Sequence, residues 1–146
     1  MKKIILILIV VLIGIQFIQP EKNISTSNSM AIENIEEVPV EIESIISKSC
    51  ADCHSNSTNY PWYNTIAPVS WYLANHINEG KEHLNFSEWG NYNNNQKKHI
   101  IKDLEEVLES HEMPLKSYIL LHKEAMLTNA EYELFLNWVK NLEVKE

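Results

Sequence analysis

Cys50-Ala51-Asp52-Cys53-His54 is the stretch that decides how this chain folds. It contains both cysteines of the protein and places a histidine directly after the second one. Two thiols three residues apart lie on the same side of one helical turn. Cys-x-x-Cys-His is also the spacing at which a c-type haem is attached covalently, with the histidine binding the iron. The motif therefore predicts one haem c per chain, held by Cys50, Cys53 and His54.

Other chemistry at the motif has to be weighed against haem. A thioredoxin-like Cys-x-x-Cys opens a helix after a strand, whereas residues 37–49 are typical of a helix that ends at the motif. A disulfide within the motif would close too small a loop to stabilise much. Structural zinc would need two more ligands, and the other histidines form no second ligand pair: His76, His83, His99, His111 and His122.

The N-terminal residues 1–20 are typical of an export signal. Lys2 and Lys3 precede an almost wholly apolar run from Ile4 to Ile18. About 15 residues is shorter than the roughly 20 that a membrane span needs, and no small-residue cleavage site follows the run. We expect an uncleaved signal anchor on the periplasmic side of the bacterial inner membrane. Cleavage to a soluble periplasmic protein is the alternative.

The rest of the chain divides into a linker and one domain. Residues 21–36 are polar and rich in Ser and Asn, which predicts a tether that holds the domain off the membrane. Residues 37–146 suit a single small domain. A hydrophobic core of that size is marginal by itself, and a bound haem would add apolar filling.

Four segments of this domain are predicted to be helical, and nothing in it alternates like a strand. The first, residues 38–49, carries the motif at its far end. The second, residues 68–80, has proline at its start and glycine just past its end. The third, residues 94–110, has an apolar stripe on one face. The last begins at Thr128, whose hydroxyl can cap the helix while Glu131 reaches back. The sequence thus predicts an all-α fold.

A motif at the end of an N-terminal helix, followed by an aromatic C-terminal helix, resembles the small cytochromes c. The chain is still more similar to the bacterial haem-binding domain family of cell-envelope proteins, from Cys50 to about Trp138. That resemblance implies a cytochrome c-like helical domain wrapped around one haem and preceded by an apolar anchor helix. The stretches that carry it are Cys50-Ala51-Asp52-Cys53-His54-Ser55, Tyr60-Pro61-Trp62-Tyr63, Ile66-Ala67-Pro68-Val69-Ser70-Trp71, Asn78 to Trp89, and Met113-Pro114.

The second axial ligand of the iron is expected to be Met113. Proline after methionine favours an extended loop that can present the thioether inward, and the resembling families place their distal methionine at this position. His76, on the second predicted helix, is the second choice, because another imidazole would also bind iron. His111 is a local competitor. The remaining candidates are expected to be surface or packing residues: His83, His99, His122 and Met126.

Aromatic side chains are abundant for so small a domain: Trp62, Tyr63, Trp71 and Trp89. Each is expected either at a haem edge or in an ordinary core. Tyr118 and Lys116 follow Met113 closely, so they are expected near the haem propionates.

The function that these observations favour is one-electron transfer by an exported, membrane-tethered monohaem cytochrome, with His54 and Met113 on the iron. No substrate chemistry is required, so the protein is not expected to be an enzyme. Its net charge of −8 favours redox partner proteins with a basic docking surface and argues against nucleic acid. The alternative is a haem-based small-ligand sensor or a peroxidase-like domain with an open distal site.

Overall fold

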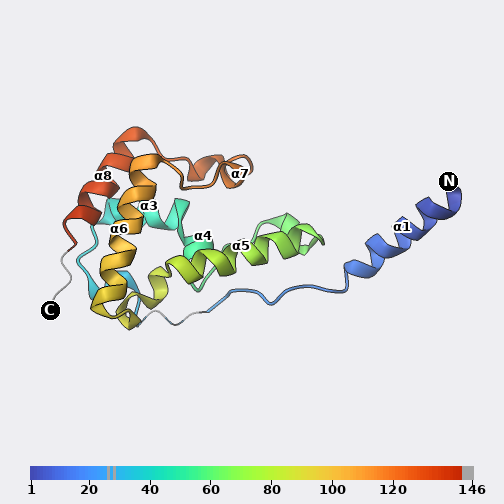
Figure 1. Cartoon of the computed structure of the whole chain (residues 1–146), viewed down its shortest axis with the longest axis horizontal. Helices are drawn as coiled ribbons and strands as arrows, with labels where there is room; N and C mark the ends of the chain where they lie inside the picture. Colours follow the sequence, from blue (N-terminus) through green and yellow to red (C-terminus); the bar gives the residue numbers. More distant parts are fainter. Residues whose placement is uncertain (26, 28, 143–146) are drawn as a thin grey trace.

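The computed structural model describes residues 1–25, 27 and 29–142. Residues 26 and 28 of the predicted tether and the end of the predicted domain, residues 143–146, lie outside the described residues. The described chain contains helices and one isolated bridge between Ile24 and Ser57, but no strand, which confirms the all-α class (Figure 1). The elements are α1 (Lys2–Ile15), α2 (Ile32–Ile35), α3 (Val40–Ser49), α4 (Ala51–His54), η1 (Trp62–Thr65), α5 (Val69–His83), η2 (Phe86–Asn91), α6 (Asn94–Ser110), α7 (Lys116–Ile119), η3 (Lys123–Ala125) and α8 (Asn129–Lys140).

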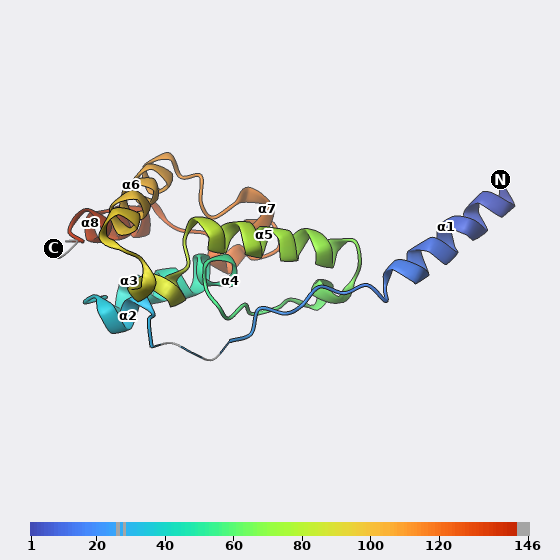
Figure 2. The same cartoon turned by 60° about the horizontal axis from the view of Figure 1, so that its bottom comes forward.

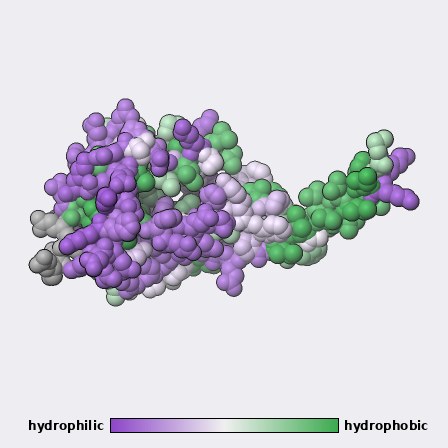
Figure 3. Space-filling model, viewed as in Figure 1, coloured by the Kyte–Doolittle hydropathy of each residue, from purple (hydrophilic) through white to green (hydrophobic). Residues whose placement is uncertain are grey.

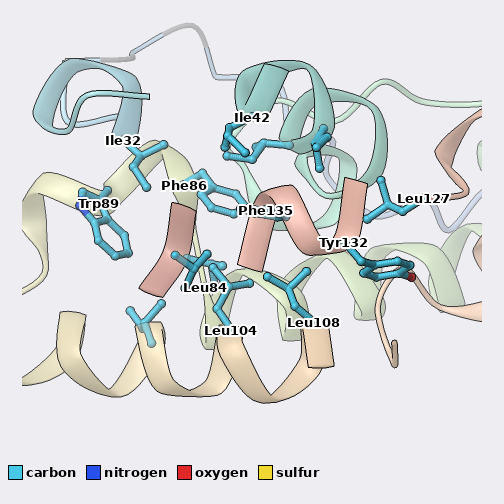
Figure 4. Close-up of a cluster of buried hydrophobic side chains, with 14 residues drawn as sticks. Ile32, Ile42, Leu84, Phe86, Trp89, Leu104, Leu108, Leu127, Tyr132 and Phe135 are labelled. Carbon is cyan, nitrogen blue, oxygen red and sulfur yellow. The ribbon is translucent and has the colours of Figure 1, made fainter. Parts of the chain in front are cut away.

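The hydrophobic core lies where α3, α6 and α8 meet. Helix α8 contacts both α6 and α3, and Figure 4 shows their apolar side chains pointing toward one another. Phe135 and Val139 of α8 are completely buried. Residues spaced three and four apart share one helix face, which is why each helix contributes a stripe: Ile42, Ile45 and Ile46; Ile100, Leu104 and Leu108; Tyr132, Phe135 and Val139.

Side-chain caps fix the starts of α6 and α8. The Thr128 hydroxyl accepts a hydrogen bond from the Glu131 amide, and the Glu131 carboxylate accepts one from the Thr128 amide, as predicted. Asn93 and Gln96 form the same reciprocal pair at the start of α6. Each pair satisfies two backbone donors that a helix leaves free at its N-terminus. Both helices therefore begin where local sequence dictates.

Helix α5 is longer than predicted, because Gly80 lies inside the helix instead of ending it. The helix continues to His83. A side chain at Gly80 would bring its Cβ to 2.8 Å from the carbonyl oxygen of Cys53, which is closer than real Cβ contacts. The glycine thus lets α5 pack directly against the turn of the motif.

The segment predicted as a tether makes specific contacts with the domain. Ala31 and Ile32 are buried, α2 contacts η2, and the amide of Gly90 donates to the carbonyl of Met30 at 2.8 Å. The segment is polar on average, but its few apolar residues gain by entering the core. A free tether along all of residues 21–36 is therefore not what the structure shows.

Helix α1 projects from one end of the domain (Figures 1 and 2). None of its residues is buried, and Figure 3 shows its surface as hydrophobic beside a largely hydrophilic domain. Within the described part of the chain, no helix has both the length and the apolar character needed to cross a membrane. The signal anchor expected at residues 1–20 stays a prediction.

Candidate functional site

The motif forms one tight turn between α3 and α5. Helix α3 ends at Ser49, and the carbonyl of Cys50 accepts hydrogen bonds from the amides of Cys53 and His54 at 3.1 and 2.9 Å. The hydroxyl of Ser49 is buried and donates to the carbonyl of Ala125 at 2.9 Å, which ties the end of α3 to η3. Cys50, Cys53 and His54 are therefore held together on a fixed backbone.

The imidazole of His54 is oriented by the main chain. Its Nδ1 lies 2.9 Å from the carbonyl oxygen of Leu84. Burial lowers the pKa of His54, although hydrogen bonds to the carbonyls of Leu84 and Gly80 oppose that shift. A carbonyl can only accept, so the proton resides on Nδ1 and the lone pair on Nε2 is left for a ligand. Metal-binding histidines usually show this arrangement.

The two thiols of the motif are not joined in a disulfide, and both are half-buried. Burial, with a smaller contribution from the charge of Cys53, raises the pKa of Cys50 to about 12. Burial, with a smaller contribution from Asp52, raises the pKa of Cys53 to about 11. Redox-active cysteines have a lowered pKa, so these thiols do not match a thioredoxin-like site.

The ligand side chains around the motif decide which metal group it can hold. In residues 1–25, 27 and 29–142, no three His, Cys, Asp or Glu side chains gather into a group that could hold a metal ion. A zinc site of the structural kind needs four such ligands. The donors that the motif itself offers, two thiols and one imidazole with a free Nε2, fit covalent haem.

A polar cluster that the sequence did not predict lies beside the motif. The hydroxyl of Tyr118 donates to Oδ2 of Asp52 at 2.6 Å, and its ring stacks on His122 at a centroid distance of 4.3 Å. Oη of Tyr63 lies 2.7 Å from Nε2 of His122. Burial, together with the bond to Asp52, raises the pKa of Tyr118, which therefore stays a proton donor. Lys116, by contrast, is exposed at the start of α7.

A cleft of about 410 Å³ opens beside this cluster, along the motif turn. Its lining comes from three separate parts of the chain, namely α3 with α4, the loop before η1, and α7 with η3. Such a cleft depends on contacts between residues far apart in sequence, so no local pattern predicts it. The charged and aromatic side chains in its lining are Lys48, Asp52, Tyr60, Tyr118, His122 and Glu124.

Met113 lies in the loop between α6 and α7 and is half-buried. Its carbonyl oxygen accepts a hydrogen bond from the hydroxyl of Tyr132 at 2.8 Å. The ring of His111 stacks on the same tyrosine at a centroid distance of 3.9 Å. Helix α8 thus holds the loop through Tyr132. The assignment of Met113 as the second iron ligand stays a prediction.

The other candidate ligands lie in varied surroundings. His76, the second choice, lies within hydrogen-bonding distance of the carbonyl of Tyr72 in its own helix, at 3.1 Å. His99 pairs with Asp103 on the surface of α6, and His83 and Met126 are exposed. His122, expected at the surface, instead belongs to the polar cluster beside the motif.

Of the four aromatic residues singled out, only Tyr63 joins the cluster beside the motif. Trp89 is an ordinary core residue whose indole N–H donates to Oε1 of Glu36 at 2.8 Å. Trp62 is 80% exposed. The indole N–H of Trp71 donates to the carbonyl of Ile18, just past α1. These two tryptophans lie at the end of the domain from which α1 emerges.

Comparison with protein families gives a match. A family model described as a haem-binding domain matches residues 10–141, which is most of the chain. No curated protein and no solved structure matches it.

Proposed function

The chain belongs to the haem-binding domain family, and from this premise we propose that its haem is of type c, with Cys50 and Cys53 forming the thioether bonds and His54 binding the iron. The observation that carries the proposal is the hydrogen bond from Nδ1 of His54 to the backbone carbonyl of Leu84. It leaves Nε2 as the ligand atom on the same turn that presents both thiols. Attachment requires both thiols to be free, and Cys50 and Cys53 are not joined in a disulfide.

We propose one-electron transfer as the role of the bound group. Haem supplies an iron that exchanges a single electron when its coordination shell stays fixed. This chain would fix the shell from two sides, because Leu84 orients His54 and Tyr132 holds the backbone of Met113. If His54 and Met113 both bound the iron, small molecules would have no free position on it. A role as an enzyme is not part of this proposal.

The proposal includes export and association with a membrane. Helix α1 begins with Lys2 and Lys3, is otherwise apolar and has no buried residue, and these features support both. At about 1.5 Å per residue, a helix of this length is about 21 Å long, less than the roughly 30 Å of a bilayer core. We therefore propose that α1 associates with the periplasmic face of the inner membrane without crossing it. Redox partners with a basic surface would fit the net charge of −8.

A second candidate function has one observation in its favour. The cleft beside the motif is lined by Asp52, Tyr118 and His122, which are groups able to donate or accept protons. Such a cleft suits a haem-based small-ligand sensor or a peroxidase-like domain, provided that Met113 does not occupy the iron. The two functions therefore differ in what binds opposite His54.

Optical spectra of the protein, produced with a cytochrome c maturation system, test both proposals. We expect covalently held haem, a near-infrared methionine-to-iron band, and no carbon monoxide binding by the reduced protein. Met113→Ala should lose the band and bind carbon monoxide, whereas Met126→Ala, at an exposed methionine, should keep the spectrum of the parent protein. Carbon monoxide binding by the unaltered protein would favour the sensor. Haem that separates from the denatured chain would contradict attachment through Cys50 and Cys53.

A further inference from the structure

We propose that the end of the domain formed by η1 and the first turns of α5 lies against the lipid bilayer, with Trp62, Trp71 and Tyr72 in the membrane interface. This inference rests on the membrane association of α1 proposed above and adds how the domain sits on the membrane. It replaces the expected tether with direct docking of the domain.

The junction after α1 is held to this end of the domain by side-chain hydrogen bonds. Nε2 of Gln16 donates to the carbonyl of Ala67 at 3.0 Å, and Oε1 of Gln16 accepts a hydrogen bond from the backbone amide of Ala67 at 2.9 Å. Nε2 of Gln19 donates to the carbonyl of Thr65 at 3.2 Å. The chain therefore reaches the domain within a few residues of the end of α1, which leaves no slack for a spacer.

Trp71 adds a fourth bond at the same place. Its indole N–H donates to the carbonyl of Ile18 at 2.7 Å. Figures 1 and 2 both show α1 leaving the molecule near the N-terminal end of α5, with α6 and α8 at the other end. A bilayer that takes up α1 thus meets η1 and the start of α5 first.

The surface at this end is apolar and aromatic. Trp62 is 80% exposed and Tyr72 is 59% exposed. Further large apolar side chains are exposed around them: Phe17, Ile18, Ile66, Val69 and Trp71. Figure 3 shows hydrophobic surface continuing from α1 onto the adjoining end of the domain. Tryptophan and tyrosine favour the membrane–water interface, because one part of each ring is apolar and the other can form hydrogen bonds.

The segment that forms this surface carries no charged residue of its own, and the charged side chains of Glu21 and Lys22 lie at its edge, beside Tyr60. Between Tyr60 and Asn78 the sequence has no Asp, Glu, Lys or Arg, although the whole chain has 20 acidic and 12 basic residues. The stretch from Ile4 to Pro20 is also free of charge. A charged side chain is costly in or near the hydrocarbon region. The two uncharged stretches meet at the hydrogen bonds of Gln16 and Gln19, so together they form one surface that fits a bilayer.

Photo-crosslinking from lipid tests this docking. The haem-loaded full chain is mixed with phosphatidylcholine vesicles that contain a phospholipid with a diazirine near its headgroup, floated, irradiated and digested for mass spectrometry. We expect label on peptides covering residues 1–20 and 60–78, and none on residues 94–110 of α6 at the far end. Trp62→Glu should lower the label on residues 60–78 several-fold. Leu134→Glu, at an exposed position of α8, is the matched control and should leave it unchanged.

The outcomes separate the inference from the proposal beneath it. Label confined to residues 1–20 in protein that floats with the vesicles would overturn docking and leave the membrane association of α1 intact. Equal labelling of residues 60–78 in Trp62→Glu and in the parent protein would overturn the placement of Trp62 in the interface. Protein that neither floats nor takes up label would overturn the membrane association and the docking together.

Discussion

Gly80 lies where α5 packs against the turn that carries Cys50, Cys53 and His54. A Cβ there would lie 2.8 Å from the Cys53 carbonyl oxygen and 3.2 Å from its Cβ. Overpacking of this kind costs about 1–3 kcal/mol, whereas alanine gains about 1 kcal/mol over glycine inside a helix. We therefore expect Gly80→Ala to lower the free energy of unfolding by about 1 kcal/mol, measured by urea titration of the haem-loaded protein.

Gly14→Ala is the matched control for this prediction, because nothing lies within 4 Å of the position where its Cβ would be. It should leave the unfolding of the domain unchanged. A Gly80→Ala protein as stable as the parent would show that α4 and α5 are free to move apart.

Tyr118 secures the loop after Met113 to the motif turn through its bond to Asp52. A hydrogen bond to a charged group contributes about 1.5–3 kcal/mol, and this half-buried one belongs at the lower end. Tyr118→Phe should therefore lower the free energy of unfolding by about 1.5 kcal/mol, measured by thermal or urea unfolding. Tyr72→Phe, on the exposed surface of α5, should have no effect. Equal stability of the two variants would contradict a stabilising role for the Asp52 bond.

The sequence identified the residues of the motif but did not predict which residues form hydrogen bonds with them and with the neighbouring side chains. Cys50, Cys53 and His54 form a local pattern, so their spacing was enough to predict one turn that carries all three. The partner of His54 is a backbone carbonyl 30 residues away, and the partners of Asp52 and Tyr63 are 66 and 59 residues away. Contacts over such separations depend on how helices pack, and a single sequence carries no direct signal of that.

At the scale of helices, a salt bridge between Lys48 of α3 and Glu131 of α8 links the first and last helices of the core. The hydrogen bond from Lys48, followed by that from the Thr128 amide, lowers the pKa of Glu131 from its ordinary 4.5 to about 2. A lowered folded-state pKa stabilises the fold above the unfolded-state value. The contribution of ionised Glu131 to the free energy of unfolding is thus complete above about pH 4.5 and is lost as the pH falls through about 2. The side chains of Lys48 and Glu131 are both about a third exposed, so solvent screens the salt bridge and its contribution to stability is modest.

Glu131→Gln tests this pH dependence. Glutamine at the third helical position can still accept from the Thr128 amide, so the variant removes the charge and keeps the cap. We expect the parent protein to lose more stability than Glu131→Gln when urea titrations at about pH 6 and about pH 3 are compared. Glu133→Gln makes the same change of charge on the exposed side of α8 and should behave like the parent. Identical losses in all three proteins would contradict the Lys48 pairing.

The helices differ in how well local sequence predicted them. The bounds of α6 agree with the predicted residues 94–110, and Thr128 caps α8 as predicted, because capping and helical periodicity act within a few residues. The end of α5 was wrong, since glycine serves equally for a helix end and for a close approach between helices. The burial of Ile32 in a polar stretch was missed because it depends on packing against η2, far along the chain.

For the whole molecule, the net charge of −8 would make docking to the proposed redox partners sensitive to salt. The Debye length falls from about 30 Å at 0.01 M to about 8 Å at 0.15 M ionic strength. Electron transfer to a basic acceptor protein should therefore slow by about tenfold or more over this range, measured by stopped-flow absorbance of the haem. An acidic acceptor of similar potential is the control, and its rate should rise. Rates that do not depend on salt would contradict an electrostatic docking surface.

The acceptor for His54 is a backbone atom, and this has a consequence for how the protein tolerates mutation. Every residue has a carbonyl, so replacing the side chain of Leu84 changes packing but leaves the hydrogen bond to Nδ1 available. A carboxylate in the same role could be deleted by a single codon change. The orientation of the His54 imidazole therefore depends on the path of the backbone at the end of α5, and a substitution can change it only by moving that backbone.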